Sequence, residues 1–359
     1  MLLPAPTALP SFPRLWMLQA MAPPLLVVST RSGHVESEHG VHAVVVDDSG
    51  GIVASAGDPD RQAWWRSAAK LIQAIACVED GAADAFGFDD RALALACASH
   101  SAEDAHVEVA TAMLRACGCD ESVLACGPHA SLSSSVARVH IKGDTVLGPR
   151  HNNCSGKHAA MIALARHRGW SLAGYERPEH PVQQRLLDEV CAFTGLDRAH
   201  VGIGVDNCRA VTFRLSLRGM ATAWARAGTS PSSSVKRLRE AMWQHPTLVA
   251  GTGRSCTTFL SAAPGRLLVK VGAEGVYCAS VPERGLGIAL KVDSGDGRAA
   301  QSALAEILRQ LDDDSSSCCS ATVDPLPHAA WHKLARLPVK DTRGDDVGVI
   351  EARGSLGWR

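Results

Sequence analysis

Short runs of apolar and β-branched residues stand near both ends of the chain, and each run predicts a strand. Near the start, residues 41–47 and 51–57 are separated by Asp48-Ser49-Gly50, a pattern that predicts a β-hairpin. Further runs stand at residues 25–30, 201–205, 267–271, 276–281 and 286–292. Most of these strands lie close together in sequence, so we expect them to pair in an antiparallel way.

The middle of the chain shows helical spacing instead. Over residues 66–79 the apolar positions Leu71, Ile72, Ile75 and Val78 fall on one face. Another helix is expected to start at Ser101, with Asp104 completing a capping-box pattern. The predicted helices cover residues 66–79, 101–117, 156–167, 180–193, 215–227, 232–244 and 299–311, and a polar loop follows at 312–320. This order predicts an α+β fold, with an antiparallel sheet built from both termini, flanking helices and a helical middle lobe.

The two ends of the chain differ in composition from the rest. The first 25 residues contain six prolines and lack the basic and apolar regions of a signal peptide. We therefore expect residues 1–24 to form a disordered extension, and residues 25–359 to form one folded domain. No apolar stretch approaches the roughly 20 residues of a membrane-spanning helix.

Charge and cysteine content narrow the function classes. The formal net charge of −1 gives neither the basic surface of a nucleic-acid-binding protein nor a polybasic membrane patch. Most of the 12 cysteines stand in apolar runs, without a CxxC pair or the regular spacing of a disulfide framework. They are typical of small buried residues in a protein of the reducing cytoplasm.

The segment Arg66-Ser67-Ala68-Ala69-Lys70 is the first candidate for chemistry. A serine at a helix start and a lysine three residues later face the same side, and a desolvated or cation-flanked lysine can act as the base for such a hydroxyl. The alternative is a capping serine beside a solvated lysine. The same spacing occurs at Ser233 and Lys236, where capping explains it fully.

Three other segments carry candidate groups. Cys154 and Lys157 stand at a predicted helix start, and with Cys208, which follows a predicted strand, they could hold a zinc ion. Ordinary helix capping is the alternative. Lys270 ends a predicted strand, and could hold a substrate carboxylate or be a plain edge-strand lysine. In Ser99-His100-Ser101, Ser99 could join a catalytic cluster, or Ser101 could merely cap the following helix.

Taken together, these segments resemble the asparaginase II-type family, the Rhizobium-type or class 3 L-asparaginases. Eight segments occur in family order over roughly residues 27–350: ESEHG (36–40), RSAAK (66–70), ASHS (98–101), CGPH (126–129), NNCSGKH (152–158), HPVQ (180–183), LVAGTGR (248–254) and GAEGVY (272–277). The resemblance implies a fold similar to serine β-lactamases, a homodimer, and hydrolysis of L-asparagine to aspartate and ammonia.

The resemblance also implies residue roles. Ser67 would be the nucleophile or part of its pair, Lys70 its base, and Ser99 a second hydroxyl. Substrate binding would involve Arg66, His100, Asp206 and Lys270. One zinc per chain would be held by Cys154, Lys157 and Cys208, and would position the substrate rather than activate water.

The chain departs from the family pattern beside these residues. Asn207, Arg209 and Val211 stand where the family prefers small residues and a proline, and Ser294 replaces one of two acids. Two alternatives therefore stay open: a related amidase or acyl-transfer enzyme with another small substrate, and a weakly catalytic homologue that binds an amino acid or a metal. A zinc hydrolase with metal-activated water is disfavoured because Ser67 and Lys70 would be idle.

Overall fold

The computed structural model describes residues 22–313 and 324–359. Residues 1–21 of the expected extension, and the part of the expected polar loop from residue 314 onward, lie outside this range. Ala22 is the first described residue, and its carbonyl oxygen accepts a hydrogen bond from Gly57 N at 2.9 Å. The first described residue therefore lies against the end of the second strand of the expected hairpin.

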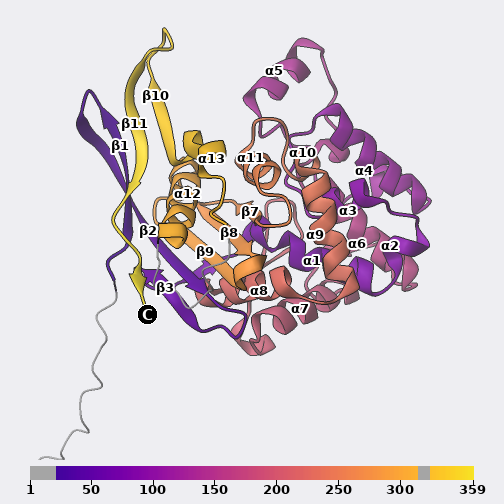
Figure 1. Ribbon diagram of the computed structural model, residues 1–359. Helices are drawn as coiled ribbons and strands as arrows, with labels where there is room; N and C mark the ends of the chain where they lie inside the picture. Colours follow the sequence, from indigo (N-terminus) through magenta and orange to yellow (C-terminus); the bar gives the residue numbers. More distant parts are fainter. Residues whose placement is uncertain (1–21, 314–323) are drawn as a thin grey trace, which may run out of the picture.

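An antiparallel sheet forms one side of the molecule (Figure 1). Its strands are β1 (Leu25–Arg31), β2 (His34–Val46), β3 (Ile52–Ala56), β7 (Leu268–Gly272), β8 (Val276–Val281), β9 (Leu286–Val292), β10 (Arg336–Lys340), β11 (Asp346–Arg353) and β12 (Gly357–Trp358). The main path runs β10-β11-β1-β2-β9-β8-β7, and β3 pairs with β2 and β12. Strand β2 lies between a strand from the N-terminal part and a strand from the C-terminal part of the chain. Val41 pairs with Leu25 of β1 and with Val292 of β9.

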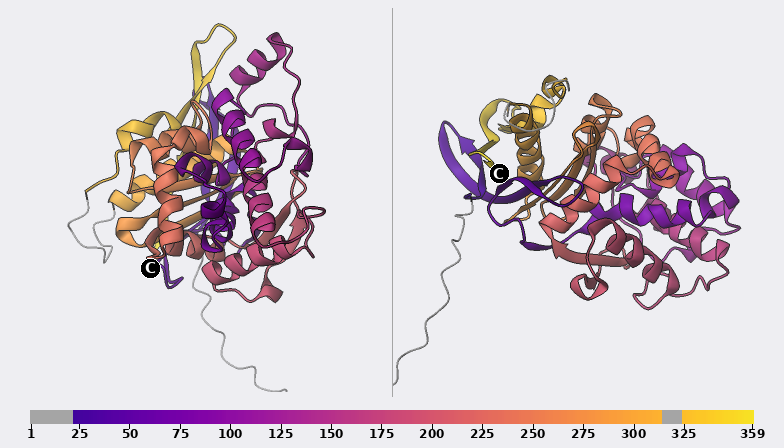
Figure 2. Two further views of the ribbon diagram at one scale, coloured as in Figure 1. Left: turned by 90° about the vertical axis from the view of Figure 1, so that its right-hand side faces the viewer. Right: turned by 60° about the horizontal axis from the view of Figure 1, so that its bottom comes forward.

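Helices fill the other side. They are α1 (Lys70–Glu79), α2 (Ala82–Ala85), α3 (Asp90–Ala96), α4 (Asp104–Ala116), α5 (Ser134–Lys142), α6 (Ser155–His167), α7 (Pro181–Thr194), α8 (Leu217–Thr229), α9 (Ser233–Gln244), α10 (Pro246–Val249), α11 (Ser255–Ala262), α12 (Gly297–Asp313) and α13 (His328–Ala335). A small sheet, ordered β4 (Gln62–Trp64), β6 (Val211–Ser216), β5 (Gly202–Val205), adjoins them. Figures 1 and 2 show α1 to α7 gathered in a lobe beyond the edge strand β7.

The part of the sheet around β8 and β9 is buried on both faces, in keeping with the unbroken apolar character of these two strands. At Gly287 of β9, an added Cβ atom would stand 2.0 Å from the Ala221 carbonyl oxygen of α8. Since successive side chains of a strand point to opposite faces, Ile288 and Leu290 face away from α8, toward the side where α12 packs. The sheet therefore separates α8 from α12 and α13.

The α+β arrangement predicted from the sequence, with strands from both termini and a helical middle lobe, is confirmed. Among the details that differ, three are informative, while β4 and several helices, including α3, α5, α11 and α13, were also not predicted. The stretch predicted as a helix from residue 215 begins as strand β6, which pairs with β4 and β5 before α8 starts at Leu217. The hairpin β10–β11 was not predicted. In the structure most of its apolar positions are only half-buried.

The third difference concerns the start of α4. Ser101 was expected to begin this helix, but the helix starts at Asp104 and Glu103 is its N-cap. The Glu103 N–H donates to His106 Nδ1 at 3.1 Å, which closes a capping box two residues later than expected. The Ser101 hydroxyl instead donates to the Ala250 carbonyl oxygen at 3.0 Å. Tertiary contact with the segment before α11 thus overrides the local capping signal.

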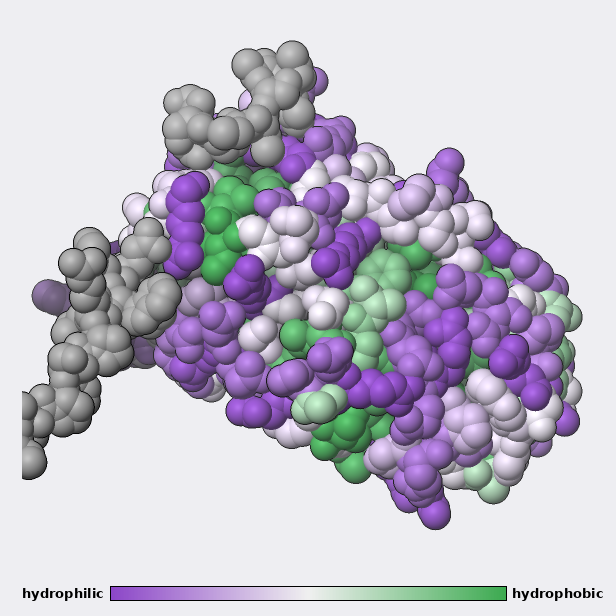
Figure 3. All heavy atoms as spheres, turned by 90° about the horizontal axis from the view of Figure 1, so that it is seen from below, coloured by the Kyte–Doolittle hydropathy of each residue, from purple (hydrophilic) through white to green (hydrophobic). Residues whose placement is uncertain are grey.

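The surface shows no single broad apolar area in the view from below, where hydrophilic and hydrophobic residues are interspersed (Figure 3). Across the described residues, none of the helices combines the length and the apolar character needed to cross a membrane.

We predict that Gly287→Val destabilises the protein by about 3 kcal/mol or more, because the new side chain meets backbone atoms of α8 that cannot move aside. The free energy of unfolding in urea measures this change. Gly297→Ala is the matched control, since a Cβ atom there meets nothing within 4 Å and should leave the stability nearly unchanged. Equal stability of the two variants would contradict the packing of α8 against β9.

Candidate active site

Ser67 and Lys70 lie where the small sheet meets the helical lobe. A 3₁₀ turn, Arg66–Ala69, leads from β4 into α1. Arg66 has a φ of 53°, in the left-handed region that costs a non-glycine residue about 1 kcal/mol or more. Such strain concentrates at functional sites because the surroundings must hold it in place. It sets the direction in which half-buried Ser67 enters the turn and buried Lys70 begins the helix.

Ser99 is the point where two lysines meet. Lys70 Nζ donates to Ser99 Oγ at 2.9 Å and also to the Ala98 carbonyl oxygen. Lys270 Nζ, which comes from β7, donates to the same Ser99 Oγ at 2.9 Å. Both lysine side chains are fully buried. The structure therefore brings together Lys70, Ser99 and Lys270, three residues that lie far apart in the sequence.

The Ser67 hydroxyl makes no hydrogen bond to another described residue, and Lys70 Nζ is engaged by Ala98 and Ser99. Ser67 is nevertheless tied to Lys70 through the backbone, since the Lys70 N–H donates to the Ser67 carbonyl oxygen. A half-buried hydroxyl one turn from a buried lysine is free to meet a substrate.

Lys270 has a pKa lowered to about 7. Burial is the main cause, because it disfavours the charged amine. A Cys256 thiolate would raise the pKa, while the positive charges of Lys70 and Arg254 lower it further. A lysine with this pKa is partly neutral at physiological pH, so it can both accept and return a proton.

A second cluster consists of Cys154, Lys157 and Cys208, all buried. Cys154 is the N-cap residue of α6, which places Lys157 in the first turn, and Lys157 Nζ lies 3.3 Å from Cys208 Sγ. A hydrogen bond from the Cys154 thiol, opposed by burial and aided by the Lys157 charge, lowers the pKa of Cys208 to about 5. Donating that bond, together with burial, raises the pKa of Cys154 to about 12. Cys208 is therefore a thiolate at neutral pH.

This donor set fits a zinc ion in part. Burial acts to lower the pKa of Lys157, but Cys208 and Cys154 outweigh it and raise the pKa, so Lys157 would have to lose a proton before binding a metal. Two sulfur donors and one amine converge at one point, and one thiol has already lost its proton. Within residues 22–313 and 324–359, no three or more His, Cys, Asp and Glu side chains are grouped to hold a metal. The cluster here supplies two such side chains and a lysine, which is an unusual zinc ligand.

Asp206 connects the two clusters. Its Oδ1 accepts a hydrogen bond from Arg66 Nε at 2.8 Å, and the neighbouring Asn207 Oδ1 accepts one from Arg66 Nη2 at 3.1 Å. Burial acts to raise the pKa of Asp206, but the charges of Lys157 and Arg66 outweigh it and the pKa is lowered. Asp206 is therefore an ionised carboxylate between the Ser67 turn and the cysteines.

Two of the departures from the family pattern fall in this turn. Arg209 has a φ of 71° and donates its backbone N–H to the Asp206 carbonyl oxygen at 2.8 Å, while its side chain is exposed. Asn207 serves as a partner of Arg66. Ser294, a departure outside this turn, pairs its hydroxyl with His39 Nδ1 at 2.7 Å. The turn thus accommodates Arg209 by turning its side chain toward solvent.

His100 is placed beside the cluster with both ring nitrogens engaged. Its Nδ1 accepts from the Ala102 N–H at 3.1 Å, so Nε2 carries the proton and donates to Ser155 Oγ at 2.9 Å. Burial, followed by the charge of His106, keeps the pKa of His100 well below its usual range. In this arrangement a neutral His100 anchors the Ser99 loop to the start of α6.

Sequence reasoning missed the roles of Cys256 and Gly272, two residues near Lys270. Cys256 Sγ accepts from the Val271 N–H at 3.3 Å and lies 3.1 Å from the Tyr277 hydroxyl, which fixes the end of β7. At Gly272 an added Cβ atom would stand 2.9 Å from the Trp65 carbonyl oxygen, so the strand and the Ser67 turn are in close contact. The only signal in the sequence was that Gly272 belongs to one of the matching segments. By contrast, Ser233 and Lys236 are exposed on α9.

A family model described as L-asparaginase II matches residues 27–352. A comparison with curated proteins finds no match.

Among solved structures, the chain is similar to a beta-lactamase from Mycobacterium bovis, with 16% identity over 72% of this chain and 88% of that chain, and a TM-score of 0.41. A candidate beta-lactamase from Bacteroides dorei has 12% identity, coverages of 77% and 87%, and a TM-score of 0.37. A mutant of simvastatin synthase from Aspergillus terreus has 11% identity, coverages of 70% and 86%, and a TM-score of 0.29. Likeness at this level concerns the course of the chain and says nothing of chemistry.

We predict that the Lys270 side chain titrates near pH 7, whereas an unperturbed lysine titrates at about 10.4. NMR of ¹³Cε-labelled lysine measures both. The resonance should disappear in Lys270→Gln and persist in Lys236→Gln, the exposed control. Because the amine is neutral above its pKa, any step in which Lys270 accepts a proton should speed up as pH rises through 7. If every lysine titrated above pH 9, the buried environment of Lys270 would be wrong.

Proposed function

Because this chain belongs to the L-asparaginase II family, we propose that it hydrolyses the side-chain amide of L-asparagine to aspartate and ammonia. The observation that supports this proposal best is the contact of Lys70 and Lys270 with one hydroxyl, Ser99 Oγ, because Lys70 itself lies one helical turn after Ser67. Such a group can take up a proton from a nucleophile and return it to a leaving group, which is what amide hydrolysis requires.

In the proposed reaction, the Ser67 hydroxyl oxygen attacks the amide carbon and a C–O bond forms. The Ser67 proton passes to Lys70. The Ser99 hydroxyl can relay a proton between Lys70 and Lys270, and the pKa of about 7 lets Lys270 hold that proton temporarily. When the C–N bond breaks, the proton leaves with ammonia. Water then attacks the Ser67 ester along the same path in reverse, and aspartate is released.

Charges around Ser67 support an amino-acid substrate. Arg66 and Lys270 are cationic or partly cationic groups for the α-carboxylate, and the Asp206 carboxylate is a partner for the α-ammonium group. The same cations would stabilise the negative oxygen of the tetrahedral intermediate. In this proposal His100 contributes by holding the Ser99 loop in place.

The alternatives differ in measurable ways. A related amidase or acyl-transfer enzyme would use the same Ser67 and Lys70 on another small substrate, and would release more ammonia from glutamine or simple amides than from asparagine. A weakly catalytic homologue would bind asparagine in calorimetry without turning it over. The family match favours the first proposal over both.

We further propose one zinc ion per chain, held by Cys154, Lys157 and Cys208. A bound zinc would supply positive charge near the substrate. The support is the convergence of the three buried side chains and the low pKa of Cys208. Assembly as a homodimer, and a cytoplasmic location, rest on the family resemblance and the cysteine pattern. Light scattering and cell fractionation test them.

We predict that purified protein releases ammonia from asparagine and much less from glutamine. Ser67→Ala and Lys70→Ala should each lower turnover on the order of 10³-fold or more, and the double variant should be little worse, because the two groups act as a unit. Ser233→Ala, in the exposed segment with the same spacing, should stay near wild type. No ammonia above blank would refute the function. If Lys70→Ala kept most activity, the proton acceptor would instead be Lys270 through Ser99.

We predict about one zinc per chain by elemental analysis, falling as the pH is lowered because protons compete for the ligands. Cys154→Ser and Cys208→Ser should each lose most of the metal, while Cys191→Ser, a half-buried cysteine remote in sequence from the cluster, should keep it. Metal content is read independently of activity. Unchanged zinc in the first two variants would exclude this site.

A further inference from the structure

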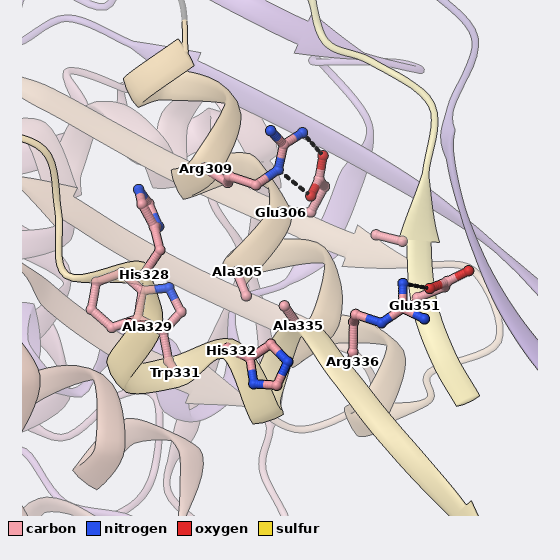
Figure 4. Close-up of a pocket in the computed structure, with 11 residues that line it drawn as sticks. Ala305, Glu306, Arg309, His328, Ala329, Trp331, His332, Ala335, Arg336 and Glu351 are labelled. Atoms are coloured by element: carbon pink, nitrogen blue, oxygen red, sulfur yellow. Dashed lines mark hydrogen bonds and ion pairs between the residues drawn. The ribbon is translucent and has the colours of Figure 1, made fainter. Parts of the chain in front are cut away.

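A cavity of about 400 Å³ lies on the side of the sheet away from α8, between α12, α13 and the strands β10 and β11. This volume is within the usual range for small-molecule sites. Four alanines form much of its wall: Ala305, Ala329, Ala335 and Ala352. The close-up view shows polar side chains around this apolar wall (Figure 4). None of the residues assigned to the active site lines the cavity.

The inner part of the cavity holds an unpaired donor. Trp331 is 1% exposed, yet its Nε1 has no hydrogen-bond partner within the described chain. Figure 4 shows its indole among the residues that line the cavity, beneath His328. A buried N–H left without an acceptor costs about 1–3 kcal/mol, so this position favours a ligand that supplies an acceptor. Other buried tryptophans meet this need internally, as Trp243 does by donating to the Leu267 carbonyl oxygen at 2.8 Å.

An unpaired acceptor accompanies this donor. His328 Nε2 lies 2.6 Å from Asp312 Oδ2, and since a carboxylate only accepts, Nε2 carries the proton. In the neutral ring Nδ1 is then an acceptor, and it too is buried without a partner among the described residues. The His328 and Trp331 rings pack edge to face with centroids 5.5 Å apart. A group that carries an acceptor and a donor on one carbon atom satisfies both, and a primary amide is such a group.

The rim of the cavity carries charges of both signs. Arg309 binds Glu306 through two hydrogen bonds, of 2.9 and 2.6 Å, and Arg336 pairs with Glu351. The Arg309 and Arg336 side chains are about half exposed. Arg309 also pairs with Asp313, whereas Arg336 pairs with Glu351 alone among the described residues and so keeps donors for a ligand. Because positive and negative groups are balanced, the rim suits a zwitterion better than a net anion or cation.

From these observations we propose that the cavity binds a free amino acid whose side chain ends in a primary amide, in a site separate from the active site. The amide would pair with Trp331 Nε1 and His328 Nδ1, the methylene groups would lie on the alanine wall, and the α-ammonium and α-carboxylate groups would meet the rim. Glutamine has two methylene groups between the amide and the α-carbon, and is the probe of choice.

The cavity is joined to the active site by packed side chains. The ring centroids of Trp331 and Phe259 are 5.2 Å apart, and those of Phe259 and Tyr277 are 6.2 Å apart. The Tyr277 hydroxyl contacts Cys256, whose Sγ accepts from the backbone N–H that follows Lys270. Binding at Trp331 therefore occurs on the same packed unit that supports the end of β7.

The test uses full-length Ser67→Ala, so that added amino acids are not consumed, with ¹⁵N-labelled tryptophan indoles. Trp331→Phe in the same background assigns the Trp331 indole resonance. Glutamine added to about 10 mM should shift that resonance in a saturable way and leave the Trp243 resonance in place. Asparagine, the shorter homologue, is titrated alongside it. Glutamate, which lacks the amide, and butyramide, which lacks the zwitterion, should each bind at least about tenfold more weakly.

Arg336→Ala provides a second variant, which leaves the buried aromatic residues intact and should weaken glutamine binding without affecting butyramide. The proposal is overturned if the Trp331 resonance does not move with glutamine or asparagine. It is also overturned if glutamate or alanine moves the resonance as much as glutamine does, since the amide would then play no part.

Discussion

The structure depends above all on two buried lysines that share one hydroxyl. Lys70 and Lys270 are fully buried, and both donate to Ser99 Oγ. Burial disfavours the charge of Lys270, and the positive charge of Lys70 beside it adds to this effect. The tension is relieved by loss of a proton, and Lys270, with a pKa of about 7, can lose one at physiological pH. A proton acceptor near neutrality thus follows from packing alone.

The architecture holds these lysines in place from two directions. Lys270 is on β7, the edge strand of a sheet whose other strands come from both termini, and Lys70 begins the first helix of the lobe. Close contact between Gly272 and the Trp65 carbonyl oxygen fixes the distance between sheet and lobe. Because β2 ties the terminal strands to β9, the position of Lys270 depends on residues at both ends of the chain.

The local sequence pattern predicted the element correctly where the segment is strongly apolar. The helix from Lys70 and the strands β8 and β9 follow their apolar spacing, and the α+β order follows from them. Pattern failed where tertiary contacts decided. Ser101 has the chemistry of a helix cap, but its hydroxyl is used by Ala250, and Glu103 caps α4 instead. The end of strand β6 was missed because no loop separates it from α8, which starts at Leu217 directly after Ser216.

The sequence by itself determined which residue types were available for chemistry: Ser67 and Lys70 on one helical turn, Cys154 and Lys157 on another, and the family resemblance that links them. Spacing within a turn is fixed by helix geometry, so these pairs could be read directly. Only the tertiary structure decided that Lys70 contacts Ser99, that Lys270 joins them, and that Asp206 stands between Arg66 and Lys157. These contacts join residues 29 to 171 positions apart and depend on strand pairing and on burial of both faces of the central strands, which no local pattern encodes.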